Sequence, residues 1–196
     1  PSELASSIQA IVRDSIAAKQ RLLESSTEIL ALVAERLINT IRAGNKMLIF
    51  GNGGSAADAQ HVAGELVGRF FMESPPWPVI ALTTDTSILT CVANDWAFEQ
   101  VFARQVRALA RPGDLVAGIS TSGRSKNVLY GLEEARRLGA ATIGFCGEDA
   151  GTMNDLCEVC FAAPSSSTPR IQELHLAGWH AVCEVTERAL MGDKRS

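Results

Sequence analysis

An imidazole and a carboxylate lie four residues apart in this sequence, at His61 and Glu65. On a helix, side chains at this spacing share one face, with roughly 6 Å between their Cβ atoms. A pair placed in this way can bind one metal ion, or it can act as an acid and a base. It can also be a solvated ion pair on a surface helix.

A glycine-rich turn directly before this pair favours a functional site. The apolar run 47–50 is typical of a buried parallel strand, and the turn 51–54 follows it. We expect Ser55 to cap the next helix, about 54–70, with Asp58 completing a weak capping box. Free backbone N–H groups at such a helix start attract anions. The turn lacks the Lys-Ser/Thr ending of a nucleotide phosphate loop and the spacing Gly-x-Gly-x-x-Gly.

A second turn, rich in hydroxyl groups, follows another apolar run, 115–119. It contains Ser120, Thr121, Ser122 and Ser125. Hydroxyl and backbone N–H groups at a helix start suit a phosphate group. An ordinary serine-capped helix would explain Ser122 or Ser125 but not the whole cluster, so we expect a phosphate site here.

The last predicted helix begins at Thr168–Pro169, because proline is favoured in a first turn, and it ends near 190. Gln172 and His180 are eight residues apart on it, roughly 80° around the axis and two turns along it. Their long side chains could converge on one point, although the spacing alone does not define a ligand set. His175 lies nearly opposite His180, so we expect it to pack inside or to face solvent.

The remaining pattern alternates helices and strands. We predict helices over 3–20, 24–43, 86–110 (with a break near Asn94–Asp95) and 125–138, and strands over 79–82, 115–119, 141–145 and 159–162. Together with the strand near 47–50, these elements predict an α/β fold with a doubly wound, parallel five-stranded sheet. We expect one domain over 1–196: a helical pair, 1–44, that packs on the domain and on a partner chain, and an α/β core, 45–196. The last residues, 193–196, should form a frayed tail.

Composition limits the classes of function. The chain has 196 residues, of which 46% are hydrophobic and 20% charged, enough for one well-packed domain. A net charge of −4 argues against a general nucleic-acid binder. No apolar run approaches the ~20 residues of a membrane span, and no signal peptide is visible. We therefore expect a cytoplasmic protein without nucleic-acid or membrane partners.

The five cysteines predict structural roles. Cys91, Cys146 and Cys183 lie in apolar runs, where a free thiol behaves as a small hydrophobe. Cys157 and Cys160 form a C-x-x-C motif, but a zinc site would need a second pair. A redox motif should open a helix, whereas this one runs into a strand. Free thiols suit a reducing cytoplasm.

With its two anion turns after parallel strands, the chain resembles the sugar isomerase (SIS) domain proteins. It is more closely similar to their phosphoheptose isomerase family, over essentially the whole chain. The SIS turns are common to many sugar-phosphate proteins, whereas the set His61, Glu65, Gln172 and His180 is far more specific. The residues that carry the resemblance are Gly51–Ser55, His61, Glu65, Asn94–Asp95, Ser120–Gly123, Ser125, Arg170–Glu173 and His180.

The resemblance implies an aldose–ketose isomerase that converts sedoheptulose 7-phosphate to D-glycero-D-manno-heptose 7-phosphate, the first step toward nucleotide-activated heptose. It also implies a homotetramer with active sites at subunit interfaces. One Zn²⁺ per subunit would be held by His61, Glu65, Gln172 and His180. The phosphate would bind Ser120, Thr121, Ser122 and Ser125, and the sugar Asn52, Gly53, Gly54, Ser55, Glu65, Asn94, Asp95 and Gln172.

Within this reading, Glu65 is the expected base and His180 its acid partner. The reaction moves a proton between two carbons through an enediol, and it needs a base, an acid and a group that stabilises the oxyanion. A zinc ion that polarises the C2 carbonyl would supply the electrophile. A residue that ligates zinc is less free to move protons, so ligation by Glu65 or His180 would have to exchange during turnover.

Two alternatives belong to other functional classes. One is a non-catalytic SIS protein that binds the DnaA replication initiator; we expect such a protein to have lost the acid–base residues, whereas this chain keeps Glu65 and His180. The other is a sugar-phosphate-sensing regulator, which usually carries an added helix-turn-helix domain for which this chain has no room.

Overall fold

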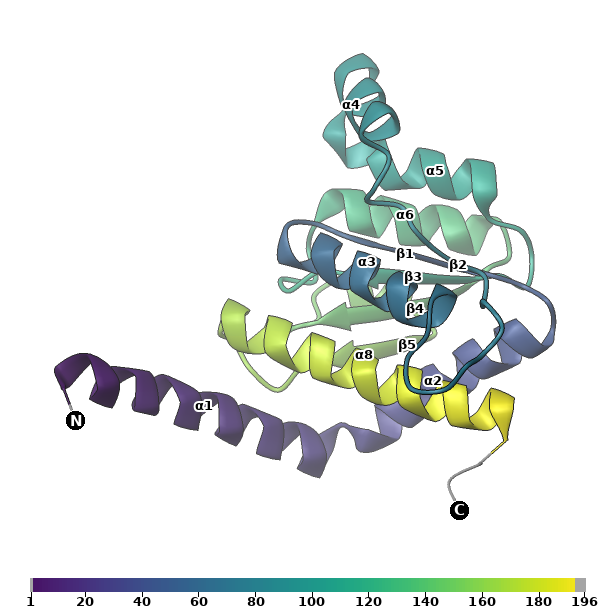
Figure 1. Cartoon of the computed structure of the whole chain (residues 1–196). Helices are drawn as coiled ribbons and strands as arrows, with labels where there is room; N and C mark the ends of the chain where they lie inside the picture. Colours follow the sequence, from purple (N-terminus) through teal and green to yellow (C-terminus); the bar gives the residue numbers. More distant parts are fainter. Residues whose placement is uncertain (1, 193–196) are drawn as a thin grey trace.

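The computed structural model of the chain describes residues 2–192, and a parallel sheet of five strands lies at its centre (Figure 1). The strands are β1 (Met47–Gly51), β2 (Val79–Ala81), β3 (Leu115–Ile119), β4 (Ala141–Cys146) and β5 (Val159–Ala162), in the spatial order β2-β1-β3-β4-β5. All four neighbouring pairs are parallel. This is the strand order of a flavodoxin-like doubly wound sheet, which confirms the predicted fold class.

Helices surround the sheet. They are α1 (Glu3–Ser25), α2 (Thr27–Arg42), α3 (Gly54–Val67), α4 (Thr86–Asp95), α5 (Val101–Leu109), α6 (Lys126–Arg137), α7 (Met153–Leu156) and α8 (Thr168–Met191), with a 3₁₀ turn, η1 (Phe98–Gln100). The predicted helices are confirmed within a few residues, and the break near 94–95 falls between α4 and η1. Only the one-turn helix α7 is additional. The predicted tail, 193–196, lies outside the described residues.

The two faces of the sheet form two hydrophobic cores, because successive strand residues point to opposite sides. In β1, Met47 and Ile49 belong to the core under α2, α3 and α8. Leu48 and Phe50 belong to the core under α4, α5 and α6. Every residue of β1 and β3 is buried. Burial on both faces explains why the central strands are continuous apolar runs in the sequence.

The N-terminal helices differ in how they join this body. Helix α2 packs along α8 and buries a full apolar stripe, including Val33 and Leu37. Helix α1 extends away from the body (Figure 1) and buries only Ala18. Polar contacts attach it to α8: Ser15 donates to Glu173 at 2.6 Å, and Arg170 donates to the Ile11 carbonyl oxygen at 3.1 Å.

The turn after β1 differs from the predicted cap. Helix α3 begins at Gly54, and the residue before it, Gly53, has a φ of 56°. Ser55 is buried inside the first turn, and no side chain caps the helix. The capping roles predicted for Ser55 and Asp58 are therefore wrong. The turn is tight: a Cβ at Gly51 would lie 2.7 Å from the Cβ of Ser55, so Ser55 packs against the end of β1 inside the first helical turn instead of preceding the helix.

The cysteines are free thiols. Cys91 is exposed on α4, where its thiol donates to Asp95 at 3.4 Å, so its predicted role as a small hydrophobe is wrong. The apolar residues around it in sequence supply the inner face of α4, and Cys91 lies on the other face. Cys146 on β4 brings its sulfur within 3.6 Å of that of Cys160 on β5, which extends the C-x-x-C motif to a packed group of thiols. Within residues 2–192, no helix is long and apolar enough to cross a membrane.

Candidate active site

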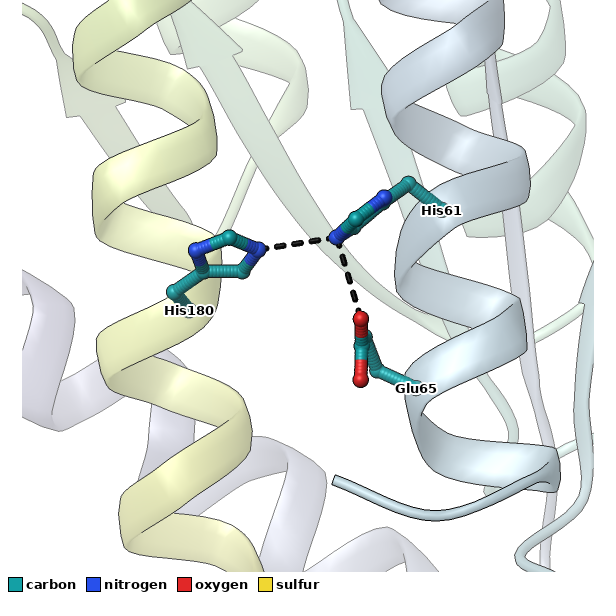
Figure 2. Close-up of side chains that lie close together, drawn as sticks. All are labelled: His61, Glu65 and His180. Carbon is teal, nitrogen blue, oxygen red and sulfur yellow. Dashed lines mark hydrogen bonds and ion pairs between the residues drawn. The ribbon is translucent and has the colours of Figure 1, made fainter. Parts of the chain in front are cut away.

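Three side chains that could bind a metal ion meet between α3 and α8 (Figure 2). His61 and Glu65 come from α3, and His180 comes from α8. The Nε2 atoms of His61 and His180 are 2.8 Å apart, and His61 Nε2 lies 3.1 Å from Glu65 Oε1. The three ligand atoms all lie within 4.8 Å of one another. His180, more than a hundred residues away in the sequence, thus joins the pair predicted on α3.

The periodicity of the two helices puts these side chains at their shared edge. On α3, Ala59, Val62 and Leu66 face the core, which leaves His61 and Glu65 beside α8. On α8, Trp179 is fully buried, and its neighbour His180 is half-buried toward α3. The ring of Phe70, just after α3, lies 5.8 Å from the His180 ring between centroids. The cluster is therefore exposed to solvent on one side and bordered by the Phe70 ring on the other.

The donor set suits a small divalent cation. Imidazole nitrogen and carboxylate oxygen are typical zinc ligands, and a tetrahedron of such atoms around zinc has edges of about 3.3 Å. The contacts of 2.8 and 3.1 Å are only slightly shorter than these edges. A small outward movement of the side chains would make room for an ion, so the residues fit the metal that the sequence suggested.

Gln172, the fourth expected ligand, lies elsewhere in this structure. Its amide nitrogen packs against Gly54 at the start of α3, where a Cβ would come within 2.3 Å of it. Gly54 is seven residues before His61, about 10 Å along the helix axis. The amide therefore faces the glycine turn, between the expected sugar site and the cluster. Its role as a ligand stays a prediction.

The two predicted anion turns lie side by side. They follow β1 and β3, which are neighbours in the sheet where the order of strands reverses. In open α/β sheets, ligands bind at this switch point, outside the carboxyl ends of the strands. The amides of Asn52 and Asn127 donate to each other's oxygen, both at 2.8 Å, and so join the two turns.

The hydroxyl turn is organised around Ser120. Its hydroxyl donates to that of Ser125 at 2.9 Å and lies 3.4 Å from the Ser122 hydroxyl. The backbone N–H of Ser125 donates to Ser120 Oγ at 3.4 Å, and that of Arg124 to Ser122 Oγ at 3.2 Å. Ser125 precedes α6 without a side-chain cap to it. The hydroxyl groups thus bond to one another, and Ser125 does not cap α6, whose Val128 N–H donates to Asn127 Oδ1 at 3.0 Å. A helix start beside such hydroxyl groups can receive an anion.

A pocket of about 180 Å³ opens at the glycine turn. It is lined by Gly51, Asn52, Gly53, Ala56, Thr83, Leu89, Phe98 and Phe102. Asn94 and Asp95 are not among these lining residues: both are exposed at the end of α4, where the Asn94 amide donates to Asp95 at 2.8 Å. The structure brings the glycine turn and the hydroxyl turn together but leaves Asn94 and Asp95 outside this pocket. Their role in sugar binding stays a prediction.

His175 has no part in the cluster. It is fully buried, and its Nε2 lies 2.9 Å from the Cys146 carbonyl oxygen. Burial lowers the pKa of His175 to about 4, which keeps the ring neutral at physiological pH. Of the two expectations for His175, packing inside or facing solvent, the structure shows the first.

Three residues near the site escaped sequence reasoning. Asn127 joins the two turns, and Phe70 flanks His180. Glu187 on α8 is fully buried and accepts hydrogen bonds from the backbone of Phe71 and Met72. A signal existed for Asn127, an amide in the first turn after the hydroxyl cluster. Phe70 and Glu187 gave none, because their partners are distant in sequence.

Comparison with protein families gives a match over most of the chain. A family model described as "SIS domain" matches residues 12–147. A protein from Trichlorobacter lovleyi named "Phosphoheptose isomerase" is 52% identical over 181 residues, which cover 92% of this chain and 92% of that protein. The family model and this relative both cover more than half of the chain.

Solved structures agree. The chain is similar to the phosphoheptose isomerase from Neisseria gonorrhoeae, with a TM-score of 0.89 and 39% identity over 94% of this chain and 98% of that one. It is also similar to a phosphoheptose isomerase from Francisella tularensis, with a TM-score of 0.91 and 34% identity over the same shares of the two chains.

Proposed function

The chain belongs to the phosphoheptose isomerase family of SIS-domain proteins, and on this premise we propose that it interconverts sedoheptulose 7-phosphate and D-glycero-D-manno-heptose 7-phosphate. The reaction is the first step of nucleotide-activated heptose biosynthesis. One observation carries the proposal: a carboxylate and two imidazoles meet where α3, the helix that follows the glycine turn, packs against α8. A non-catalytic initiator-binding protein would have no need of such a group.

Proton transfer is assigned to Glu65 and His180. Glu65 removes a proton from C1 of the ketose, which gives an enediol, and the proton is returned to C2 to form the aldose. His180 exchanges a proton with the substrate oxygens as the carbonyl moves from C2 to C1. The contact of 3.1 Å between His61 and Glu65 holds the carboxylate on the side that faces α8.

A zinc ion would be held by His61, Glu65 and His180, with Gln172 as the fourth ligand. When bound, it would stabilise the negative charge that develops on the substrate oxygens. Gln172 would reach it by turning its amide from Gly54 toward the histidines. The exchange of ligands required of Glu65 and His180 is eased by their position, since one side of the cluster is open to solvent.

Substrate binding is assigned to the two turns. Ser120, Thr121, Ser122 and Ser125 would hold the phosphate at the N-terminus of α6, where the helix dipole favours an anion. Asn52, Gly53, Gly54 and Ser55, with Asn94 and Asp95, would line the sugar. The length of a seven-carbon chain would then place C1 and C2 away from the hydroxyl turn and at the cluster.

We also propose that the chain works as a homotetramer in the cytoplasm. Helix α1 exposes an apolar stripe: Leu4, Ile8, Ile11, Val12, Ile16 and Leu23. An apolar groove of about 330 Å³ lies between α2 and α8, next to the end of α1. Surfaces of this kind mark contacts between subunits. Five free thiols suit a reducing compartment.

Incubation of the purified protein with sedoheptulose 7-phosphate tests the proposal. We expect the aldose 7-phosphate to appear, a chelator to abolish turnover, and added zinc to restore it. Turnover that a chelator does not change would support the isomerase activity and contradict the role of the metal. A folded protein without turnover under any condition would refute the enzyme, and binding to DnaA would then be measured.

A further inference from the structure

A loop without regular structure, residues 68–78, connects α3 to β2 and runs beside the cluster. At its far end Trp77 is buried in the core, and its N–H donates to the Leu66 carbonyl oxygen at 3.1 Å. In the middle, the N–H groups of Phe71 and Met72 point toward α8. The far end of the loop is thus held by backbone contacts, and its middle is held by a side chain of α8.

That side chain is Glu187. It is fully buried, and both of its oxygens accept from the Phe71 N–H at 3.1 Å, while Oε1 also accepts from the Met72 N–H at 3.0 Å. Burial of a carboxylate costs free energy unless hydrogen bonds compensate it. The hydrogen bonds recorded for it here come from the loop backbone, so the loop and the carboxylate stabilise each other.

A carboxylate fits this position well. Within residues 2–192, the hydrogen bonds recorded to its two oxygens all come from backbone donors: Oε1 accepts from both N–H groups, and Oε2 accepts a further bond from that of Phe71. Glutamine would place an NH₂ group against the Phe71 N–H and lose one bond. The two acceptor atoms of Glu187 thus match the two N–H groups that the loop conformation presents to it.

The loop in turn contacts the active site. Phe70 precedes the two clamped residues, and its ring lies 5.8 Å from that of His180 and 4.6 Å from that of Phe71. Glu187 is seven residues after His180, so the two side chains leave α8 on nearly the same face. Between them lies Cys183, whose pKa is raised to about 12 by burial and by the charges of Glu65 and Glu187. The clamp therefore adjoins the cluster.

We propose that Glu187 is a positioning residue for the isomerase site: it clamps loop 68–78 so that Phe70 braces the ring of His180. The inference rests on the proposed function for its catalytic consequence, and on the hydrogen bonds for the clamp itself. A braced His180 loses less freedom when it binds a cation or moves a proton. Without the brace, the ring can turn into the open side of the cluster.

The test compares Glu187→Gln with Phe70→Ala, with Glu28→Gln on the exposed face of α2 as a control of equal charge change. In Glu187→Gln, we expect hydrogen exchange at the Phe71 and Met72 amides to rise about tenfold or more, while the Trp77 amide stays protected. Phe70→Ala should leave those amides protected. Both variants should bind zinc about 10- to 100-fold more weakly and lose kcat, as partners of ligands do.

The double variant should lose no more zinc affinity or kcat than Glu187→Gln alone, because both changes remove the same contact between Phe70 and His180. Unchanged exchange at Phe71 and Met72 in Glu187→Gln would overturn the clamp. A loosened loop with parental zinc affinity and kcat, in both single variants, would overturn the positioning role. If the parent bound no zinc, the proposed metal would be wrong, and the NMR signal of the His180 ring would test the brace instead. A changed chemical shift in both single variants would support the brace. An unchanged chemical shift in both would refute it.

Discussion

At the scale of single residues, the contact between Gly54 and Gln172 makes a direct prediction. A Cβ at Gly54 would lie 2.3 Å from the Gln172 amide nitrogen, the far end of a flexible side chain. We expect Gly54→Ala to fold normally but to displace this amide and to lower turnover about tenfold or more, because the added methyl group also enters the space assigned to the sugar and to the movement of Gln172. Steady-state kinetics and thermal unfolding measure the two effects.

Gly64 offers the matched control on the same helix. A Cβ there meets nothing within 4 Å. Gly64→Ala should therefore stabilise α3 by about 0.5–1 kcal/mol, because alanine favours helix, without a change in turnover. Equal turnover in Gly54→Ala and the parent would show that the position of Gln172 does not matter for catalysis.

The sequence could predict part of the site at this scale. The spacing of His61 and Glu65 sufficed for their shared face, because helical periodicity is local. Their contact with His180 depends on the packing of α3 against α8, which no spacing within one helix contains. Glu187 was invisible for the same reason, since its partners are backbone groups of a distant loop.

At the scale of elements, Glu134 on α6 pairs with Arg107 of α5, which links the two helices, and with Arg137 on its own helix. Its oxygens accept from Arg137 at 2.6 Å and Arg107 at 2.7 Å, and these bonds lower its pKa from 4.5 to about 2. Because its pKa is lower in the folded state, ionised Glu134 stabilises the fold above pH 4.5, and this contribution is lost as the pH falls toward 2. The arginines are largely exposed, so we expect about 1–2 kcal/mol at neutral pH.

Denaturant unfolding of Glu134→Gln measures this contribution. The variant should be less stable than the parent at pH 7, and the difference should shrink as the pH falls below 4.5. The neighbouring Glu133, which is exposed, supplies the control: Glu133→Gln should match the parent throughout. A Glu134→Gln deficit that is the same at pH 7 and pH 3.5 would contradict the assignment to the ion pairs.

Most element boundaries followed from local signals. The apolar runs predicted β1 and β3, and the proline in the first turn predicted the start of α8. The cap of α3 was predicted wrongly because Ser55 satisfies the local rule for a cap, while its close packing against Gly51 places it inside the helix. Long-range packing overrode a local preference at that point.

At the scale of the whole molecule, α1 is the element that the single chain leaves least covered. Its stripe includes Ile8 and Ile16, which are 60% and 62% exposed. We expect the double variant Ile8→Asp, Ile16→Asp to form smaller assemblies than the parent in sedimentation velocity, because charges oppose burial of the stripe. Gln9→Asp, a charge at an exposed polar position of α1, should sediment as the parent does.

Turnover of the dissociated species then reports on the site. If active sites lie at subunit interfaces, the smaller assemblies should be inactive while their circular dichroism stays native. A double variant that sediments as the parent would contradict the role of α1 in assembly. The parallel order of the strands was predictable from alternation of helices and strands. The apolar pattern of the N-terminal helices predicted a contact with a partner chain, whereas the homotetramer was only implied by the resemblance.

The most direct test of the account is the reaction of sedoheptulose 7-phosphate in heavy water, followed by NMR, with the parent and Glu65→Gln. The account predicts aldose 7-phosphate with deuterium at C2 from the parent. It predicts a rate about 10²- to 10⁴-fold lower from Glu65→Gln, since the variant has lost its base. Parental turnover by a folded Glu65→Gln that still binds zinc would contradict the assignment of the base, and with it the proposed mechanism.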